Sequence, residues 1–243
     1  MHLVSSIPGG AGGHEVVRAY AVPCTRRRLS AVSSDSHAHI GASALTHRII
    51  VGITGASGAI YGVRLLERLR ELPVETHLIA TKWARVTIEH ETDKSFAEVK
   101  ELADVVHSEN DQAASLSSGS FVTQGMVIAP CSTKTLAAIA NGFAYNLVCR
   151  AADVVLKERR KLVLVVRETP LHATHLRNML TLTEMGAIVA PPVPGFYALP
   201  ESIDDIVDQT VLRLLDQLDL TLESPFRWAG LRGAAEREPT EQD

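Results

Sequence analysis

Residues 48–70 read Arg48-Ile-Ile-Val-Gly52-Ile-Thr-Gly55-Ala-Ser57-Gly58-Ala-Ile-Tyr-Gly62-Val-Arg-Leu-Leu-Glu-Arg-Leu-Arg70, and this stretch decides the fold class. The apolar run 49–53 is typical of a strand buried on both faces, and apolar residues then recur at helical spacing. Glycines at the join allow a tight turn, while amides at the start of the helix and the Ser57 hydroxyl suit phosphate oxygens. The stretch predicts a strand, an anion-binding turn and a helix.

The glycine spacing leaves the ligand open. Gly52-x-x-Gly55-x-x-Gly58 is neither the dinucleotide fingerprint nor a P-loop, which ends in Gly-Lys-Ser/Thr. A tight turn without any ligand also fits the isolated motif. The phosphate interpretation therefore depends on what the rest of the chain adds.

Composition indicates one α/β domain with two polar tails. The chain has 243 residues, 46% of them hydrophobic, which is enough for a full core. Residues 1–46 are rich in Gly, Ser and Ala with few acids, so we expect a disordered extension, and we expect a second disordered tail over 232–243. A transit peptide also has few acids, but the extension shows no convincing amphipathic helix.

Charge and cysteine content exclude several classes of function. The net charge of −4 gives no broad electrostatic case for nucleic acid or an anionic membrane surface, and no apolar run approaches membrane-spanning length. Three cysteines cannot all pair, and Cys149 falls within an expected helix. A disulfide framework is not expected, and a reducing cytoplasm fits.

Strand-like and helix-like segments alternate between the tails. We expect strands near 49–54, 74–80, 125–129, 161–166 and 187–190, and this alternation predicts a three-layer, doubly wound parallel sheet of the Rossmann or flavodoxin type. Expected boundary signals are the capping boxes that begin at Ser95 and Ser202, and helix ends at Gly142 and Gly186. Ligands of such sheets gather at the carboxyl ends of the strands.

Polar residues follow several of the expected strands, and each has a structural alternative. Segment 130–135 places hydroxyls and an ammonium at a helix start, where Ser132 or Thr133 could equally act as the N-cap. Cys131 has no His-plus-acid pair to activate it and suits a buried thiol. In helix 146–160, Arg150 and Lys157 share one face, which could be a solvated face paired with acids.

The charged pair Arg167-Glu168 is harder to explain structurally. It directly follows the apolar strand 162–166, so it emerges at the expected ligand edge, where a carboxylate beside cations could exchange protons with a substrate. Two other patterns favour plain structural roles. Asp204-Asp205-x-x-Asp208 resembles a magnesium diphosphate motif but begins a helix, and His172 with His175 lacks a third metal ligand. No metal is expected.

Taken in order, a series of strings strongly resembles the flavin prenyltransferase family of the UbiX type. The strings are Gly55-Ala-Ser57-Gly-Ala, Ala-Pro130-Cys-Ser-Thr-Lys-Thr135-Leu-Ala, Arg150-Ala-Ala-Asp-Val, Leu-Lys157-Glu-Arg-Arg, Arg167-Glu-Thr-Pro-Leu-His, Pro-Pro-Val-Pro194-Gly-Phe-Tyr197 and Ser202-Ile-Asp-Asp-Ile-Val. The resemblance spans about residues 48–230 and implies a flavin prenyltransferase domain over 47–231. It also implies a homo-oligomer, usually a dodecamer.

The resemblance implies an activity and a set of site residues. A dimethylallyl group would pass from dimethylallyl monophosphate to N5 and C6 of reduced FMN, and the prenylated FMN would serve a UbiD-type decarboxylase. Glu168 would be the acid/base group, with Lys157 and Arg167 also catalytic. The residues implied for FMN are Gly55, Ala56, Ser57, Thr81, Ser132, Thr133, Lys134, Thr135 and Arg150. Those implied for the prenyl phosphate, partly across subunit boundaries, are Lys157, Arg167, Tyr197, Arg213 and, nearby, Trp228.

Departures from the family pattern and competing functions qualify this hypothesis. Thr81, Gly195 and the pair Ala198-Leu199 differ from many relatives, and the last pair could favour a diphosphate donor.

The runner-up function is a flavin-dependent cysteine decarboxylase, but the early catalytic His and the Pro-x-Met-Asn-x-x-Met-Trp clamp of those enzymes are not recognisable here. A non-catalytic flavin binder would not need Glu168. A nicotinamide dehydrogenase lacks an acid after the second strand.

Overall fold

The computed structural model describes residues 47–224, 227, 228 and 230. The expected disordered extension 1–46 and tail 232–243 lie outside these residues. Among the described residues, no helix combines the length and the apolar character that crossing a bilayer requires.

In the part of the chain that the structure describes, six parallel strands form one sheet in the order β3-β2-β1-β4-β5-β6. This is the Rossmann-type order, and it confirms the predicted parallel, doubly wound sheet. The chain winds from β1 through β2 to β3 in one direction, then returns to the other side of β1 and continues from β4 to β6. The strands are β1 His47–Ile53, β2 Val74–Ala80, β3 Val105–Ser108, β4 Gly125–Cys131, β5 Lys161–Val166 and β6 Ile188–Val189.

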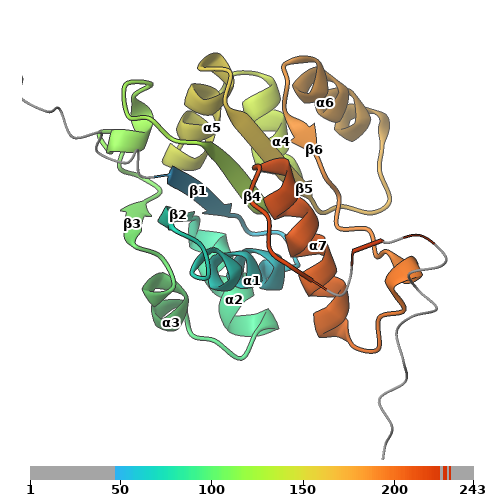
Figure 1. Ribbon diagram of the computed structural model, residues 1–243. Helices are drawn as coiled ribbons and strands as arrows, with labels where there is room; N and C mark the ends of the chain where they lie inside the picture. Colours follow the sequence, from blue (N-terminus) through green and yellow to red (C-terminus); the bar gives the residue numbers. More distant parts are fainter. Residues whose placement is uncertain (1–46, 225–226, 229, 231–243) are drawn as a thin grey trace, which may run out of the picture. The chain divides into compact units, whose positions relative to one another are not determined.

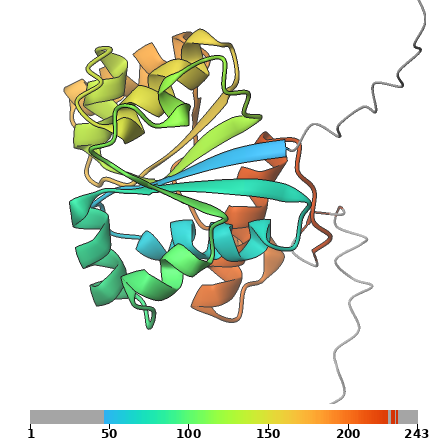
Figure 2. The ribbon, with the colours of Figure 1, turned by 90° about the vertical axis from the view of Figure 1, so that its left-hand side faces the viewer.

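Within the described residues, seven α-helices cover the two faces of the sheet (Figures 1 and 2). One core lies between the sheet and α1, α2, α3 and α7, and the other between the sheet and α4, α5 and α6. Burying each large aliphatic side chain in these cores stabilises the fold by roughly 1.5–3 kcal/mol. The helices are α1 Ala59–Leu69, α2 Lys82–Glu91, α3 Phe96–Glu101, α4 Thr133–Ala140, α5 Leu147–Lys157, α6 Ala173–Glu184 and α7 Ile203–Gln217, and the short 3₁₀ turns are η1 Ser115–Ser117 and η2 Phe196–Ala198.

Local sequence signals explain where several helices begin and end. Both predicted capping boxes are present, Ser95 with Glu98 at α3 and Ser202 with Asp205 at α7. Each satisfies amides that the first helical turn leaves without partners. Gly142 and Gly186 follow α4 and α6 with positive φ angles of 65° and 99°, which confirms their predicted place at the helix ends.

The structure differs from the predicted strands at β3, which the hydrophobic pattern did not reveal. This strand has four residues at the edge of the sheet, and its burial alternates between half-buried and exposed. Asp104, just before it, accepts hydrogen bonds from the Thr76 amide at 2.7 Å and hydroxyl at 2.8 Å. A polar contact with β2 therefore helps to hold the edge strand.

Candidate functional site

The crevice between the carboxyl ends of β1 and β4 is the point where the winding direction of the sheet reverses. The Thr54 hydroxyl donates to the Pro130 carbonyl at 2.7 Å and accepts from the Ser132 amide at 2.9 Å. One buried side chain therefore holds the loop after β1 against the loop after β4. Ligands of open α/β sheets bind at such switch points, so the geometry places a binding site here.

The turn between β1 and α1 needs its glycines for reasons of geometry. A Cβ on Gly55 would come within 2.2 Å of the Trp83 Cβ at the start of α2, and Gly58 has a φ of 97°. The amides of Gly55, Ala56 and Ser57 have no acceptor among the described residues. Successive unpaired amides in a turn form an anion-binding concavity. The predicted anion-binding turn thus has three amides available for a ligand.

The two amides that begin α1 have a partner that the sequence interpretation missed. Glu91, at the end of α2, accepts from Gly58 N at 2.7 Å and from Ala59 N at 3.1 Å. The expectation that the first amides of α1 are free for phosphate is therefore corrected, because a carboxylate already binds them. Glu91 also lines the cavity described below. No local sequence signal links it to a turn 33 residues away.

Two more helices begin at this edge of the sheet. The Thr81 hydroxyl caps α2 by accepting from Ala84 N at 3.2 Å, and Ser132 caps α4 by accepting from Thr135 N at 3.3 Å. The N-cap interpretation of Ser132 is thus confirmed, and Thr133 is the first residue of the helix. The polar starts of three helices therefore face one crevice, an arrangement that favours an anionic, polar ligand.

Lys134 and Thr135 occupy the first turn of α4 but differ in exposure. The Lys134 ammonium lies 4.6 Å from the centre of the Tyr145 ring, whereas Thr135 is buried and accepts from the Ser132 hydroxyl at 3.1 Å. A ring beneath an ammonium stabilises its charge. Lys134 therefore remains available at the surface, and Thr135 supports the cap.

Arg167 and Glu168 follow β5 and line a cavity of about 870 Å³, which we call the strand-end cavity. Ser57, Gly58, Tyr61 and Glu91 line it from the β1 side, and the segment 191–193 and α7 complete it. The Arg167 amide donates to the Cys131 carbonyl at 3.2 Å, which fixes the start of this loop. The charged residues Arg167 and Glu168, predicted at the ligand edge, thus line the same cavity as Ser57.

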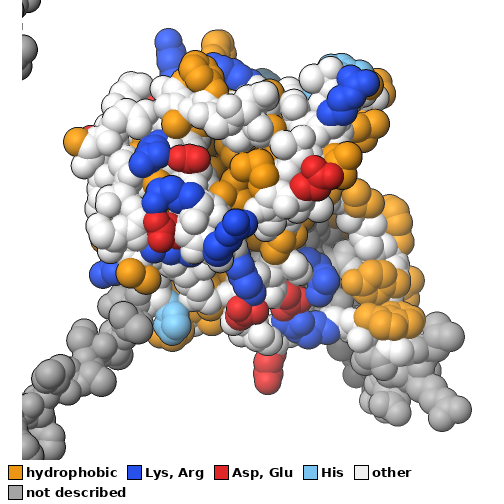
Figure 3. All heavy atoms as spheres, turned by 90° about the horizontal axis from the view of Figure 1, so that it is seen from above, with side chains coloured by type: hydrophobic (Ala, Val, Ile, Leu, Met, Phe, Trp, Pro, Cys, Tyr) orange, Lys and Arg blue, Asp and Glu red, His pale blue; other side chains and the backbone are white. Residues whose placement is uncertain are grey.

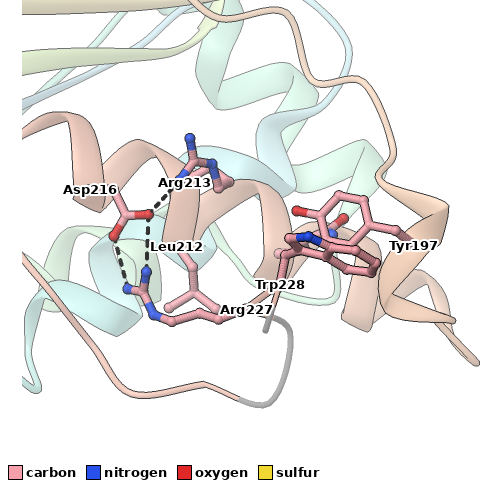
Figure 4. A pocket seen from close by; sticks show the side chains of 7 residues that line it. Tyr197, Leu212, Arg213, Asp216, Arg227 and Trp228 are labelled. Atoms are coloured by element: carbon pink, nitrogen blue, oxygen red, sulfur yellow. Dashed lines mark hydrogen bonds and ion pairs between the residues drawn. The ribbon is translucent and has the colours of Figure 1, made fainter. Parts of the chain in front are cut away.

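Tyr197, Arg213 and Trp228 meet in a second pocket of about 400 Å³ beside α7, which we call the α7 pocket (Figure 4). Its remaining lining residues are Gln209, Leu212, Asp216 and Arg227. The Tyr197 and Trp228 rings pack edge to face, with centroids 5.6 Å apart. A third pocket shares Pro191 and Val193 with the strand-end cavity and Tyr197 and Arg213 with the α7 pocket. Of the five residues predicted for the prenyl phosphate, all but Lys157 therefore line these three neighbouring pockets, namely Arg167, Tyr197, Arg213 and Trp228.

Arg150 and Lys157 line neither the strand-end cavity nor the α7 pocket. Arg150 donates to the Ser117 carbonyl at 3.2 and 3.1 Å and pairs with Asp153 at 2.7 Å. Lys157 ends α5 just before β5 begins, whereas Glu168 follows the other end of β5. Six strand residues span about 16 Å at 3.3 Å per residue. Lys157, which pairs with Glu158, is thus at the opposite edge of the sheet from Glu168.

Comparison with known proteins identifies the family. The Flavoprotein family model matches residues 40–215. A curated "Probable UbiX-like flavin prenyltransferase" of Streptomyces sp. (strain D7) is 62% identical over 188 residues, which cover 77% of this chain and 94% of the relative. The chain belongs to the UbiX-type flavin prenyltransferases. This membership confirms the family resemblance and the fold class.

Two solved UbiX structures superpose on the chain, each with a TM-score of 0.74. AnUbiX (PadA1), crystallised in complex with FMN and dimethylallyl pyrophosphate, is 55% identical and is aligned over 76% of this chain and 98% of its own. A dodecameric FMN-dependent UbiX-like decarboxylase from Escherichia coli O157:H7 is 58% identical, over 75% of this chain and 100% of its own.

The remaining candidate groups of this UbiX-type chain have structural roles. Burial raises the pKa of the Cys131 thiol, and Cys131 is fully buried, so it is not a nucleophile. The three carboxylates of the acidic motif in α7 all have partners within the protein. Asp205 belongs to the capping box, and Asp204 and Asp208 pair with Arg64 at 2.8 and 2.9 Å. The structural interpretation of this motif is confirmed.

Proposed function

We propose that this chain transfers a dimethylallyl group from dimethylallyl monophosphate to N5 and C6 of reduced FMN. The observation that carries the proposal is that Glu168 and Arg167 line the strand-end cavity together with Ser57 from the turn after β1. A carboxylate, a guanidinium and the anion-binding turn then surround one space. The 55% identical relative that was crystallised with FMN and dimethylallyl pyrophosphate supports both ligands. The product, prenylated FMN, would serve a UbiD-type decarboxylase.

The residues at the switch point fit FMN. The three unpaired amides at 55–57 suit the phosphate, and the hydroxyls of Ser57, Thr81 and Thr133 offer both donors and acceptors to a polar chain or ring edge. We propose that these groups, with Ser132, Lys134 and Thr135, hold the cofactor. When bound, reduced FMN supplies the nucleophilic nitrogen and carbon, so no protein nucleophile is needed.

Cations around the donor would stabilise the departing phosphate. Negative charge develops on the leaving oxygens when an allylic carbon–oxygen bond breaks, and fixed guanidinium groups stabilise it through charge-assisted hydrogen bonds. Arg213 and the Tyr197 hydroxyl line the α7 pocket, and Arg167 lines the strand-end cavity. We propose these residues, together with Lys157 from a neighbouring subunit, as the phosphate-binding set of a metal-independent transfer, and Arg150 as a further contact of FMN.

Glu168 is proposed as the acid/base group. It is half-buried, and its carboxylate accepts the amide of Thr169 at 3.0 Å, which orients it after β5. In this place it would give a proton to the departing phosphate or remove the ring proton when the new ring closes. Tyr61, in the same cavity, has its pKa raised by burial and so stays neutral at physiological pH.

Assembly and location follow from the same family membership. The E. coli relative is dodecameric, and we propose a homododecamer here as well. The buried free thiols Cys131 and Cys149 fit a reducing compartment, and we propose the cytoplasm. The single domain would span residues 47–231. Neither nucleic acid nor a membrane is expected as a partner.

Anaerobic incubation with reduced FMN and dimethylallyl monophosphate, followed by mass spectrometry of the extracted flavin, tests the function. A flavin heavier by one five-carbon prenyl unit is the expected result. A parallel incubation with the diphosphate decides the phosphate count of the donor. If the FMN that co-purifies stays unmodified, the result would contradict the transferase activity. It would then favour a cysteine decarboxylase or a flavin carrier.

A further inference from the structure

Asp216 in the α7 pocket holds two guanidinium groups at once (Figure 4). Arg227 donates to both of its carboxylate oxygens, at 2.8 and 3.3 Å, and Arg213 donates to one of them at 2.8 Å. The Asp216 side chain is only 16% exposed, whereas that of Arg213 is 64% exposed. A forked, two-bond contact between Arg and a carboxylate fixes geometry more strictly than a single ion pair.

The Arg227 contact ties the segment after α7 back onto that helix. Besides Asp216, Arg227 binds the Leu222 carbonyl, at 3.3 Å through Nε and 3.0 Å through Nη2. Trp228 is the next residue, and its ring packs on Tyr197. Because the Arg227 side chain is held by both Asp216 and Leu222, the backbone at Arg227 is fixed, and this orients the side chain of the next residue, Trp228. Asp216 therefore controls, through Arg227, the aromatic wall of the pocket.

The charge balance of the pocket favours an anion. Two guanidinium groups share one carboxylate, which leaves a net positive charge beside the open space. The Gln209 amide nitrogen is buried and has no hydrogen-bond partner among the described residues, while its oxygen accepts from Gly195 N at 3.0 Å. A buried N–H group without a partner costs free energy, so a ligand atom that accepts its hydrogen bond is bound more favourably. A phosphate oxygen would supply that acceptor.

We infer that Asp216 is a positioning residue for the prenyl donor. It holds Arg227 so that Trp228 closes the pocket against Tyr197, and it aims Arg213 at the donor's phosphate. The inference rests on the proposed function for the identity of the donor, but the clamp between Asp216 and Arg227 is a property of the free protein. Arg213 and Trp228 would contact the donor, whereas Asp216 acts through them.

The clamp is tested by the fluorescence of Trp228 without any substrate. The chain has two tryptophans, so a Trp83→Phe background leaves Trp228 as the reporter. Asp216→Asn and Arg227→Lys should each shift its emission to longer wavelength and increase its quenching by acrylamide, since both lose the forked contact. The double variant should change the emission no more than either single one. Unchanged emission in both single variants would overturn the clamp.

A matched control is Asp219→Asn, which makes the same substitution three residues further along. Asp219 pairs with Lys161 at 2.6 Å, is largely exposed and has a φ of 59°, which Asn adopts readily. It should leave the emission of Trp228 unchanged. If Asp216→Asn fails to fold, the result for Arg227→Lys decides, because Arg227 lies in the segment after α7 and its side chain is 40% exposed.

Kinetics separate a positioning role from a general structural one. In the Trp83-containing enzyme, Asp216→Asn and Arg227→Lys should raise the KM for the donor about tenfold, equal to about 1.4 kcal/mol, with an unchanged Kd for FMN. An equal loss of FMN affinity would overturn the positioning role. If wild-type protein makes no prenylated flavin, the proposed function fails, but the fluorescence still decides the clamp. If it prenylates flavin and the emission never shifts, only the clamp fails.

Discussion

At the scale of single residues, Glu168 is the side chain on which the proposed chemistry depends most. We expect Glu168→Gln to keep FMN bound and to lower kcat by about 10²- to 10⁴-fold, the usual contribution of a general acid or base. Flavin absorbance measures retention, and mass spectrometry of the product measures turnover. Glu184→Gln, an exposed carboxylate at the end of α6, is the matched control and should be fully active. Wild-type turnover in Glu168→Gln would remove this residue from its role.

Ser57 tests the anion-binding turn through charge alone. The residue is exposed beside three unpaired amides. We expect Ser57→Asp to weaken FMN binding at least about a hundredfold, because two like charges 4 Å apart repel by about 4 kcal/mol at an effective dielectric constant of 20. Ser57→Asn has the same size without the charge and should weaken binding far less. Equal flavin affinity of the two variants, by titration, would show that no phosphate binds here.

At the scale of elements, α1 packs so closely on the sheet that one helical glycine is essential. A Cβ on Gly62 would lie 2.2 Å from the Ala129 carbonyl and 3.0 Å from Ile53. Gly→Ala inside a helix normally stabilises it, but here we expect Gly62→Ala to lower the free energy of unfolding by about 1–3 kcal/mol through overpacking. Denaturant titration measures it. Gly142→Ala, where nothing lies within 4 Å but φ is 65°, shows for comparison the cost of backbone strain without a clash. A stabilised Gly62→Ala would contradict the packing.

The edge strand β3 adds a dependence of stability on pH. His107 Nε2 lies 2.9 Å from His77 Nδ1, and His77 Nε2 contacts Glu75 at 2.8 Å. Burial, and then the neighbouring His77, lowers the pKa of His107 below its usual 6.5, although Asp111 opposes the shift. The unfolded chain therefore binds more protons between the two pKa values. The free energy of unfolding should fall as the pH drops below about 6.5.

Equilibrium unfolding at several pH values checks this dependence. His107→Gln should flatten the slope between neutral pH and the folded-state pKa of His107, while exposed His47→Gln should not. The pKa of Asp104 is lowered, first by its bond with the Thr76 amide, so its contribution is lost only as the pH falls below about 3.8. The two groups act in separate pH windows. An unchanged slope in His107→Gln would contradict the histidine effect.

The elements also show what the sequence could predict and why it missed the rest. Strands β1, β4 and β5 carry long apolar runs, and β2 ends in a short one after three polar residues. Capping residues mark the starts of several helices, so local sequence patterns located these elements. Strand β3 has four residues and only half of them are partly buried, which gives no periodic signal. Glu91 was missed because its contact with Gly58 depends on how α2 packs beside the turn. Local pattern cannot reveal such a contact.

At the scale of the whole molecule, the positions of Lys157 and Glu168 predict that each active site needs two subunits. Within one chain, Lys157 precedes β5 and Glu168 follows it, so the length of this strand separates the two side chains. Lys157, at the end of α5, pairs with Glu158 at the edge of the sheet away from Glu168. The face over α4, α5 and α6 mixes hydrophobic side chains with both signs of charge (Figure 3), and Leu176 and Leu180 on α6 are more than half exposed. Such a surface suits contact between copies of the chain.

Subunit mixing tests the shared site. Lys157→Gln and Glu168→Gln should each be nearly inactive alone. If the two residues come from different subunits, unfolding and reassembling an equal mixture restores about a quarter of the wild-type sites, because each intact residue has an even chance at a given interface. If both residues act within one chain, no site regains both and the mixture stays inactive. Reassembled Glu168→Gln alone is the control, and size-exclusion chromatography must show the same oligomer in every sample.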